Sequence, residues 1–151
     1  MVKNPPEGMP RITPYVWYND VKAALTYLET TFGFAKRGEI IEVGPAMHAE
    51  MTYQDGVIMM GSANTEGCDN SKSPQDINAV TMGLFVYVDD VDAHCAHAKA
   101  AGAEIKMPPT DMFWGDRMYS VKDLEGHSWS FATHTKDIAP EDMILPDVCG
   151  E

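Results

Sequence analysis

The sequence predicts an α+β fold in which two βαβββ modules form a curved, mostly antiparallel sheet around a cleft, with the helices on the outer face. The first observation is a repeat, because residues 16–21 (VWYNDV) match residues 86–91 (VYVDDV) at an offset of 70. The second is that Asp55-Gly56 matches Glu125-Gly126 at the same offset. The third is that each half offers a strand, a helix and a broken strand region in the same order. A duplicated module explains all three.

The first half carries local signals for each element. Residues 12–18 are rich in Ile, Val, Tyr and Trp, as a buried strand requires. Asp20 is a good helix N-cap, and apolar residues then recur at helical spacing until Gly33 supplies the stop. The turn at residues 54–56 separates the strand-like segments 47–53 and 57–61, which predicts a hairpin.

The second half repeats the pattern. Residues 84–88 predict a strand, and Asp90 is the N-cap of the following helix. The apolar stripe of that helix and its stop are Val91, Cys95, Ala98 and Gly102. The turn at residues 123–126 separates strand-like segments at 118–121 and 128–132. We therefore expect a lead-in (1–11), a first module (12–63), a linker (64–80), a second module (81–135) and an acidic tail (136–151) for which no element is predicted.

Composition limits the class of function. The 151 residues carry 11 Lys+Arg against 23 Asp+Glu, a net charge of −12. Such a surface repels phosphate backbones, which excludes nucleic acid as an expected partner, and it favours a cationic ligand if the acid gathers near the site. Solubility alone also explains the charge. No apolar run approaches the length of a membrane helix and the N-terminus lacks a secretion signal, so we expect a cytoplasmic protein with no membrane partner.

The three cysteines are odd in number and widely separated. Cys68, Cys95 and Cys149 fit neither a disulfide framework nor a CxxC metal clip. Free thiols in a reducing compartment are expected.

With these residues in place, the chain resembles the vicinal oxygen chelate superfamily, which includes glyoxalase I, bleomycin and fosfomycin resistance proteins and extradiol dioxygenases. Residues 114–131 (WGDRMYSVKDLEGHSWSF) look like the run, from a Trp-Gly pair to a W-x-F ending, of the bleomycin-resistance-like and PhnB-like branches. Leu124 stands where the usual residue is proline. Residues 12–15 and 132–134 also look PhnB-like, so the resemblance covers about residues 11–135. It implies a homodimer.

The resemblance also implies a metal site that can be tested position by position. Enzymes of the superfamily hold a divalent metal (Zn, Ni, Mn or Fe) with His and Glu side chains from the first and last strand of each module, and adjacent substrate oxygens chelate it. Those positions fall on Thr13, Met60, Gly83 and Ser130. None of the four is a strong ligand for such a metal. We therefore expect no metal cofactor at the family positions.

Other residues offer two alternatives. His48 and Glu50 lie two apart on a strand, so they share a face, and with His127 or His134 they could form a shifted metal site. They could equally hydrogen-bond to neighbours and serve the fold. His94 and His97 lie one turn apart on the second predicted helix, where we expect a solvated face.

Strand alternation predicts the side chains that line the cleft. They form an aromatic wall with a few hydroxyls, which is a surface for stacking a planar ligand or holding a cation over a ring. By the resemblance, Trp114 borders the groove, whereas Arg117 more simply pairs with Asp116, Asp123 or a backbone carbonyl. The same aromatics could instead fill a core or a dimer interface. The candidate ligand-binding residues are Tyr15, Trp17, Met60, Phe85, Tyr87, Phe113, Trp114, Arg117, Ser128 and Ser130.

Three functions remain open on the sequence. The favoured one is a metal-free binding protein that sequesters a small aromatic or cationic molecule. The alternative is a metal-dependent lyase, isomerase or dioxygenase with shifted ligands at His48, Glu50 and His127 or His134. A third is metal-free acid–base catalysis by His48 and Glu50.

Overall fold

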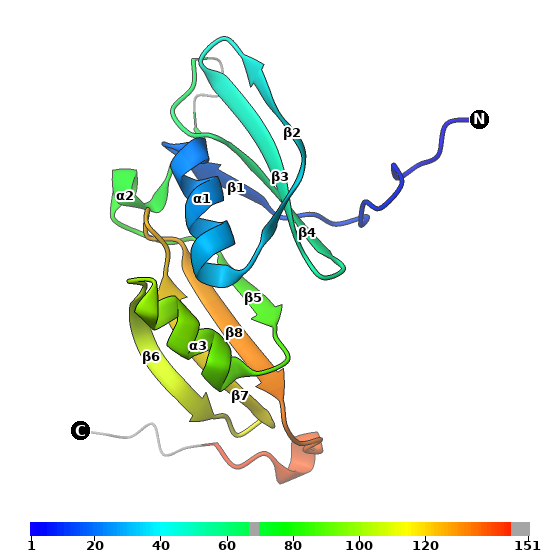
Figure 1. Cartoon of the computed structure of the whole chain (residues 1–151). Coiled ribbons are helices and arrows are strands. Elements are labelled where there is room, and N and C mark those ends of the chain that lie inside the picture. The colour runs from blue at the N-terminus through cyan, green and yellow to red at the C-terminus, as the bar shows by residue number, and fades with distance from the viewer. Residues whose placement is uncertain (67–69, 146–151) are drawn as a thin grey trace. The chain divides into compact units, whose positions relative to one another are not determined.

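The computed structural model describes residues 1–66 and 70–145 (Figure 1), so Cys68 and Cys149 lie outside the described residues. The chain forms two compact units, residues 1–79 with 124–126, and residues 80–123 with those from 127 onward. Each unit contains one four-stranded sheet. No helix in the described part of the chain has both the length and the apolar character needed to cross a membrane.

The first unit is a βαβββ module with a short extra helix. Its elements are β1 (Tyr15–Tyr18), α1 (Val21–Phe32), β2 (Ala35–Val43), β3 (Ala46–Tyr53), β4 (Gly56–Ser62) and α2 (Pro74–Ile77). The strand order is β1-β4-β3-β2, with β1 parallel to β4 and the other pairs antiparallel.

The second unit repeats this topology. Its elements are β5 (Gly83–Tyr87), α3 (Val91–Ala100), β6 (Glu104–Asp111), β7 (Asp116–Lys122), β8 (Ser128–His134) and the short 3₁₀ helix η1 (Pro140–Asp142). The strand order is β5-β8-β7-β6, again with one parallel pair. The predicted α+β class with two repeated modules is confirmed.

The helix signals in the sequence act as expected. The Asp20 carboxylate accepts from the Ala23 amide at 2.9 Å, and the Asp90 carboxylate accepts from the Ala93 amide at the same distance. Gly33 caps the end of α1 with φ 76°, a left-handed conformation that glycine adopts without strain. The two helices therefore begin where the capping residues predict.

In each unit the long helix, α1 or α3, covers one face of the sheet and leaves the other face open. Alternate residues of β1 and β3 are buried under α1, among them Val16, Tyr18 and Met51. Under α3 lie Tyr119 and Phe131, also fully buried. The residues that alternate with these buried ones, such as Tyr15 and Trp17 on β1, therefore point to the open face.

The two hairpins differ by one residue, and this difference matters for the site. Two residues separate the pair Tyr53–Gly56, whereas the Asp123 amide bonds to the His127 carbonyl across a three-residue loop. Ser130 pairs with Phe85, and the equivalent partner of Tyr15 is Met59. The offset between β4 and β8 is therefore 71 rather than 70.

With an offset of 71, Met60 is not the counterpart of Ser130, and it lies on the covered face of its sheet instead of the open face. Met60 pairs with Val16 and Ala49, and its side chain is fully buried. Because successive strand residues point to opposite faces, Met60 belongs to the core beneath α1. The expectation that Met60 lines the pocket is wrong, and Met59 is the counterpart of Ser130.

Candidate functional site

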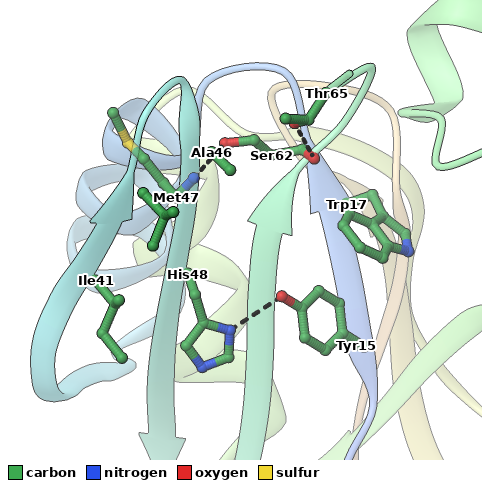
Figure 2. A pocket seen from close by; sticks show the side chains of 9 residues that line it. Tyr15, Trp17, Ile41, Ala46, Met47, His48, Ser62 and Thr65 are labelled. Carbon is green, nitrogen blue, oxygen red and sulfur yellow. Dashed lines mark hydrogen bonds between the residues drawn. The ribbon is translucent and has the colours of Figure 1, made fainter. Parts of the chain in front are cut away.

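The open face of the first unit contains a pocket of about 160 Å³ (Figure 2). The rings of Tyr15 and Trp17 on β1 form one wall, with centroids 4.6 Å apart and planes inclined by 40°. Aliphatic side chains of β2 and β3 form the opposite wall, as Figure 2 shows. The residues lining the pocket are Tyr15, Trp17, Ile41, Val43, Ala46, Met47, His48, Ser62 and Thr65. Tyr15 and Trp17 thus share the open face, as strand alternation predicts.

Gly61 provides the floor under the two rings. A Cβ at this position would lie 2.6 Å from the Tyr15 hydroxyl and 3.0 Å from the Trp17 ring. Any larger residue would therefore push both rings away from the strand.

We expect Gly61→Ala to displace both rings, changing the near-ultraviolet circular dichroism and weakening binding of an aromatic probe about tenfold. Gly83→Ala is the matched control, because a Cβ there meets only the Ser128 carbonyl at an ordinary 3.7 Å. If the two variants give the same spectrum and affinity, the rings do not depend on Gly61.

A chain of polar contacts runs along the same open face. The Tyr15 hydroxyl lies 3.0 Å from His48 Nδ1, and His48 Nε2 lies 3.6 Å from Glu50 Oε1. Glu50 forms an ion pair with Arg37, which also donates to the Glu7 carbonyl. His48 and Glu50 thus share a face as predicted, and both have protein partners.

A second cavity of about 440 Å³ adjoins this chain of contacts. It lies between the open face and the N-terminal lead-in. Its lining includes Thr13, Arg37, Glu50 and Met59, together with residues of the proline-rich segment.

The second unit presents its own aromatic open face. Phe85 and Tyr87 are 48% and 57% exposed, and their rings meet edge-on with centroids 5.3 Å apart. Ser128 and Ser130 of β8 pair with Gly83 and Phe85, so these candidates belong to the same face.

The carboxylate of Asp116 organises one end of that face. It is buried and accepts from the Tyr87 hydroxyl and Trp114 Nε1, both at 3.0 Å, and from His134 Nδ1 at 2.8 Å. Burial alone would raise the pKa of Asp116, but these three hydrogen bonds outweigh burial and lower it. His134 also contacts Asp137, and its two acidic partners raise the pKa of the imidazole. Trp114 is therefore anchored, with Phe113 packed edge-on against it.

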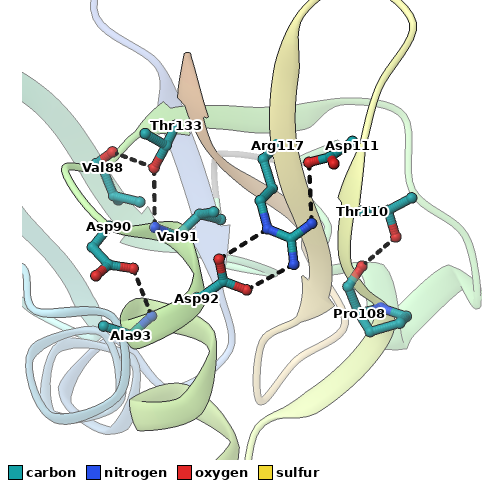
Figure 3. Close-up of polar contacts among 10 residues, drawn as sticks. All are labelled: Val88, Asp90, Val91, Asp92, Ala93, Pro108, Thr110, Asp111, Arg117 and Thr133. Atoms are coloured by element: carbon teal, nitrogen blue, oxygen red, sulfur yellow. Dashed lines mark hydrogen bonds and ion pairs between the residues drawn. The ribbon is translucent and has the colours of Figure 1, made fainter. Parts of the chain in front are cut away.

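Another sequence-based candidate, Arg117, faces α3 instead of the open face. Arg117 donates to both carboxylate oxygens of Asp92, at 2.9 and 3.0 Å, and to Asp111 at 3.1 Å (Figure 3). The hydrogen bonds that Arg117 donates to Asp92 and Asp111 raise the pKa of its guanidinium. Because Asp92 belongs to α3, Arg117 lies on the covered side of the sheet. Its role in ion pairing was expected, but its partners are not the ones predicted.

The position of His94 differs from the expected solvated helix face. Its Nδ1 lies 2.7 Å from the Tyr119 hydroxyl, and its ring centroid lies 4.3 Å from that of Phe131. His94 therefore packs onto the sheet, and the predicted solvated face is wrong for this residue. His97 is exposed, as expected.

The metal positions implied by the resemblance lack strong donors in either register. The donors at these positions are the hydroxyls of Thr13 and Ser130 and the thioether of Met59 or Met60, and Gly83 has no side chain. Within residues 1–66 and 70–145, no group of three or more His, Cys, Asp or Glu side chains is arranged to hold a metal ion. Among the shifted candidates, His134 forms ion pairs with two carboxylates, and Glu50 forms one with Arg37. The residues present do not fit the metal of the enzymes in this superfamily.

Several lining residues escaped the sequence reasoning. Ile41 and Val43 belong to β2, whose polar sequence and irregular register between Arg37 and Ile41 hide its strand pattern. Gly61 gave no signal of its own, although an isolated glycine in a strand often marks a close approach of another group.

Fold and site define a protein with two βαβββ modules and an aromatic pocket on an open sheet face. Residues 8–131 match the profile of the Glyoxalase/Bleomycin resistance protein/Dioxygenase superfamily, and the chain belongs to that superfamily.

Known proteins resemble this chain over most of its length. TioX from Micromonospora sp. ML1 is 30% identical in sequence, with a TM-score of 0.65, over 83% of this chain and 99% of that chain. A glyoxalase/bleomycin resistance protein/dioxygenase from Nocardioides is 18% identical, with the same TM-score, over 87% of this chain and 88% of that one, and shows the fold alone. An uncharacterized protein of Mycobacterium bovis is 24% identical over 136 residues, which is 89% of this chain and 90% of the relative.

Proposed function

We propose that this protein binds a small planar aromatic molecule and sequesters it without chemical change. The observation that carries the proposal is the Tyr15–Trp17 ring pair, which lies over Gly61 at the wall of an apolar pocket. Exposed aromatic rings next to aliphatic side chains are the usual lining of a small-molecule site.

The size of the pocket favours one ring system. A cavity of about 150 Å³ is enough for a benzene-sized molecule, and this pocket measures about 160 Å³. A larger ligand would insert one ring system and leave the remainder outside.

The charges near the pocket favour an aromatic over a purely cationic ligand. Glu50 is an acidic group in contact with His48, but Arg37 already neutralises it. Attraction for a cation would then come from the overall charge of −12, an effect that salt screens over about 10 Å. Stacking on the rings acts at contact and does not depend on salt in this way.

The side chains at the metal positions of the superfamily also support sequestration. The family positions hold side chains that are poor ligands for Zn, Ni, Mn or Fe, as described above. Binding without chemistry needs only affinity at stoichiometric concentration, so it requires neither a metal nor an acid–base pair.

Trp17→Ala should weaken binding of 2-naphthol by 10- to 100-fold, because one stacked ring contributes about 1–3 kcal/mol. Isothermal titration calorimetry measures the affinity, and Trp17→Phe should retain most of it. Phe85→Ala, on the open face of the second unit, is the comparison variant and should bind normally. A loss with Phe85→Ala but not with Trp17→Ala would place the ligand elsewhere.

Two measurements distinguish binding from catalysis. Elemental analysis of the purified protein should find far less than one divalent ion per chain, whereas about one tightly held ion would favour a lyase, isomerase or dioxygenase with shifted ligands. Conversion of a bound compound, followed by nuclear magnetic resonance (NMR), would instead support acid–base catalysis by His48 and Glu50.

A further inference from the structure

We infer that His48 fixes the Tyr15 hydroxyl as a hydrogen-bond acceptor toward the pocket, so that the site selects aromatic ligands carrying an O–H or N–H donor. This inference rests on the proposed function and specifies the class of ligand. Tyr15 would touch the ligand, and His48 would act through Tyr15 as a positioning residue.

The first step concerns the proton on His48. A neutral imidazole carries one N–H, on either Nδ1 or Nε2. Nε2 lies 3.6 Å from Glu50 Oε1. The nearby negative carboxylate repels a lone pair on Nε2, whereas it attracts an N–H there. The contact therefore favours the tautomer with the proton on Nε2, which leaves Nδ1 as an acceptor.

The second step concerns the hydroxyl of Tyr15. Its oxygen lies 3.0 Å from His48 Nδ1, and a dashed line marks this contact in Figure 2. With Nδ1 as the acceptor, Tyr15 must donate its only O–H to His48. The oxygen then presents lone pairs to the pocket and can accept, but not donate, a hydrogen bond from a ligand.

The charged groups around His48 support this arrangement. Glu50 lies on the same strand as His48, and Arg37 on β2 holds the Glu50 carboxylate from the other side. In the register, Ile41 on β2 and Gly61 on β4 flank His48, and neither can carry charge. Glu50 is thus the group that orients the imidazole.

The hydroxyl oxygen of Thr65 is a second hydrogen-bond acceptor in the pocket. The Thr65 hydroxyl donates to the Ser62 carbonyl at 3.0 Å, so its hydrogen is also directed into the protein. Two of the lining hydroxyls therefore offer lone pairs to the ligand. A phenol or an aromatic N–H compound satisfies them, whereas an ether or a ketone of the same shape leaves them facing an acceptor or a carbon.

The test compares 2-naphthol, which can donate, with 2-methoxynaphthalene, which keeps the ring and the oxygen but cannot. The quantity measured is the ratio of their dissociation constants at pH 7.5. Tyr15→Phe should reduce the preference for 2-naphthol by about fivefold to tenfold, because one hydrogen bond to the ligand is lost.

The His48 variants separate positioning from general damage. His48→Leu removes the acceptor and frees the Tyr15 hydroxyl to donate, so binding of 2-methoxynaphthalene should strengthen relative to that of 2-naphthol. His48→Gln offers an amide oxygen to Tyr15 and should keep most of the original preference. A merely structural role would weaken both probes together and leave their ratio unchanged.

A ligand-free measurement completes the experiment. Long-range ¹H–¹⁵N NMR correlation should show His48 protonated on Nε2 alone at pH 7.5. Protonation on Nδ1, or a probe ratio that Tyr15→Phe does not change, overturns the inference even if both probes bind. If neither probe binds, the proposed aromatic function and the ligand class both fail, whatever the tautomer of His48.

Discussion

Glu125→Ala is expected to lower the free energy of unfolding by about 3 kcal/mol, because the buried carboxylate accepts three hydrogen bonds. Its donors are the backbone amides of Asn19 and Asp20, at 2.8 and 2.9 Å, and the hydroxyl of Ser73 at 2.5 Å. Asn19 and Asp20 immediately precede α1, where the helix dipole also favours a negative charge. Alanine would remove this acceptor from all three donors, of which the Ser73 hydroxyl belongs to a fully buried residue. Equilibrium denaturation in urea measures the change.

Two further variants make this result specific. Glu125→Gln keeps the shape and one acceptor oxygen, so it should cost about half as much. Glu29→Ala, at an exposed position on α1, should change stability by no more than about 0.5 kcal/mol. If Glu125→Ala and Glu29→Ala were equally mild, the three hydrogen bonds would contribute nothing net to folding.

The parts of the fold that the sequence predicts well are those decided by local interactions. An aspartate N-cap needs only the free amides three residues ahead, so Asp20 and Asp90 identify the helix starts. The buried stripe of α3 follows from helical spacing in the same way. The aromatic residues of β1 are also placed correctly, because alternation within a single strand fixes which residues share a face.

The errors come from relations between segments. A loop longer by a single residue in the second hairpin changes the offset between β4 and β8, so the counterpart of Ser130 is Met59, and Met60 lies in the core. Arg117 and His94 depend on partners 25 residues away, Asp92 and Tyr119, that no local pattern reveals. The contact between Tyr15 and His48 likewise joins two strands, so no local pattern reveals it.

Asp116→Asn is expected to lower the free energy of unfolding by about 2–3 kcal/mol, since one of the acceptor oxygens becomes a donor facing the groups that donated to it. Tyr87, Trp114 and His134 all bond to this buried carboxylate. The anchor of Trp114 should loosen at the same time, which tryptophan fluorescence would report. Conversely, wild-type stability and fluorescence in Asp116→Asn would show that Asp116 organises nothing.

The hydrogen-bonded pair of Asp116 and His134 predicts how the stability of the fold depends on pH. The pKa of Asp116 is lowered from 3.8 in the folded protein, so its contribution is complete above about pH 4 and is lost as the pH falls further. The pKa of His134 is raised from 6.5, so its contribution is complete below about pH 6.5 and is lost as the pH rises through the folded value. The stability difference between wild type and His134→Gln should therefore be greatest between about pH 4 and 6.5 and shrink toward pH 9. Denaturation curves across this range measure it, and a difference that stays constant to pH 9 would mean that the charge on His134 does not stabilise the fold.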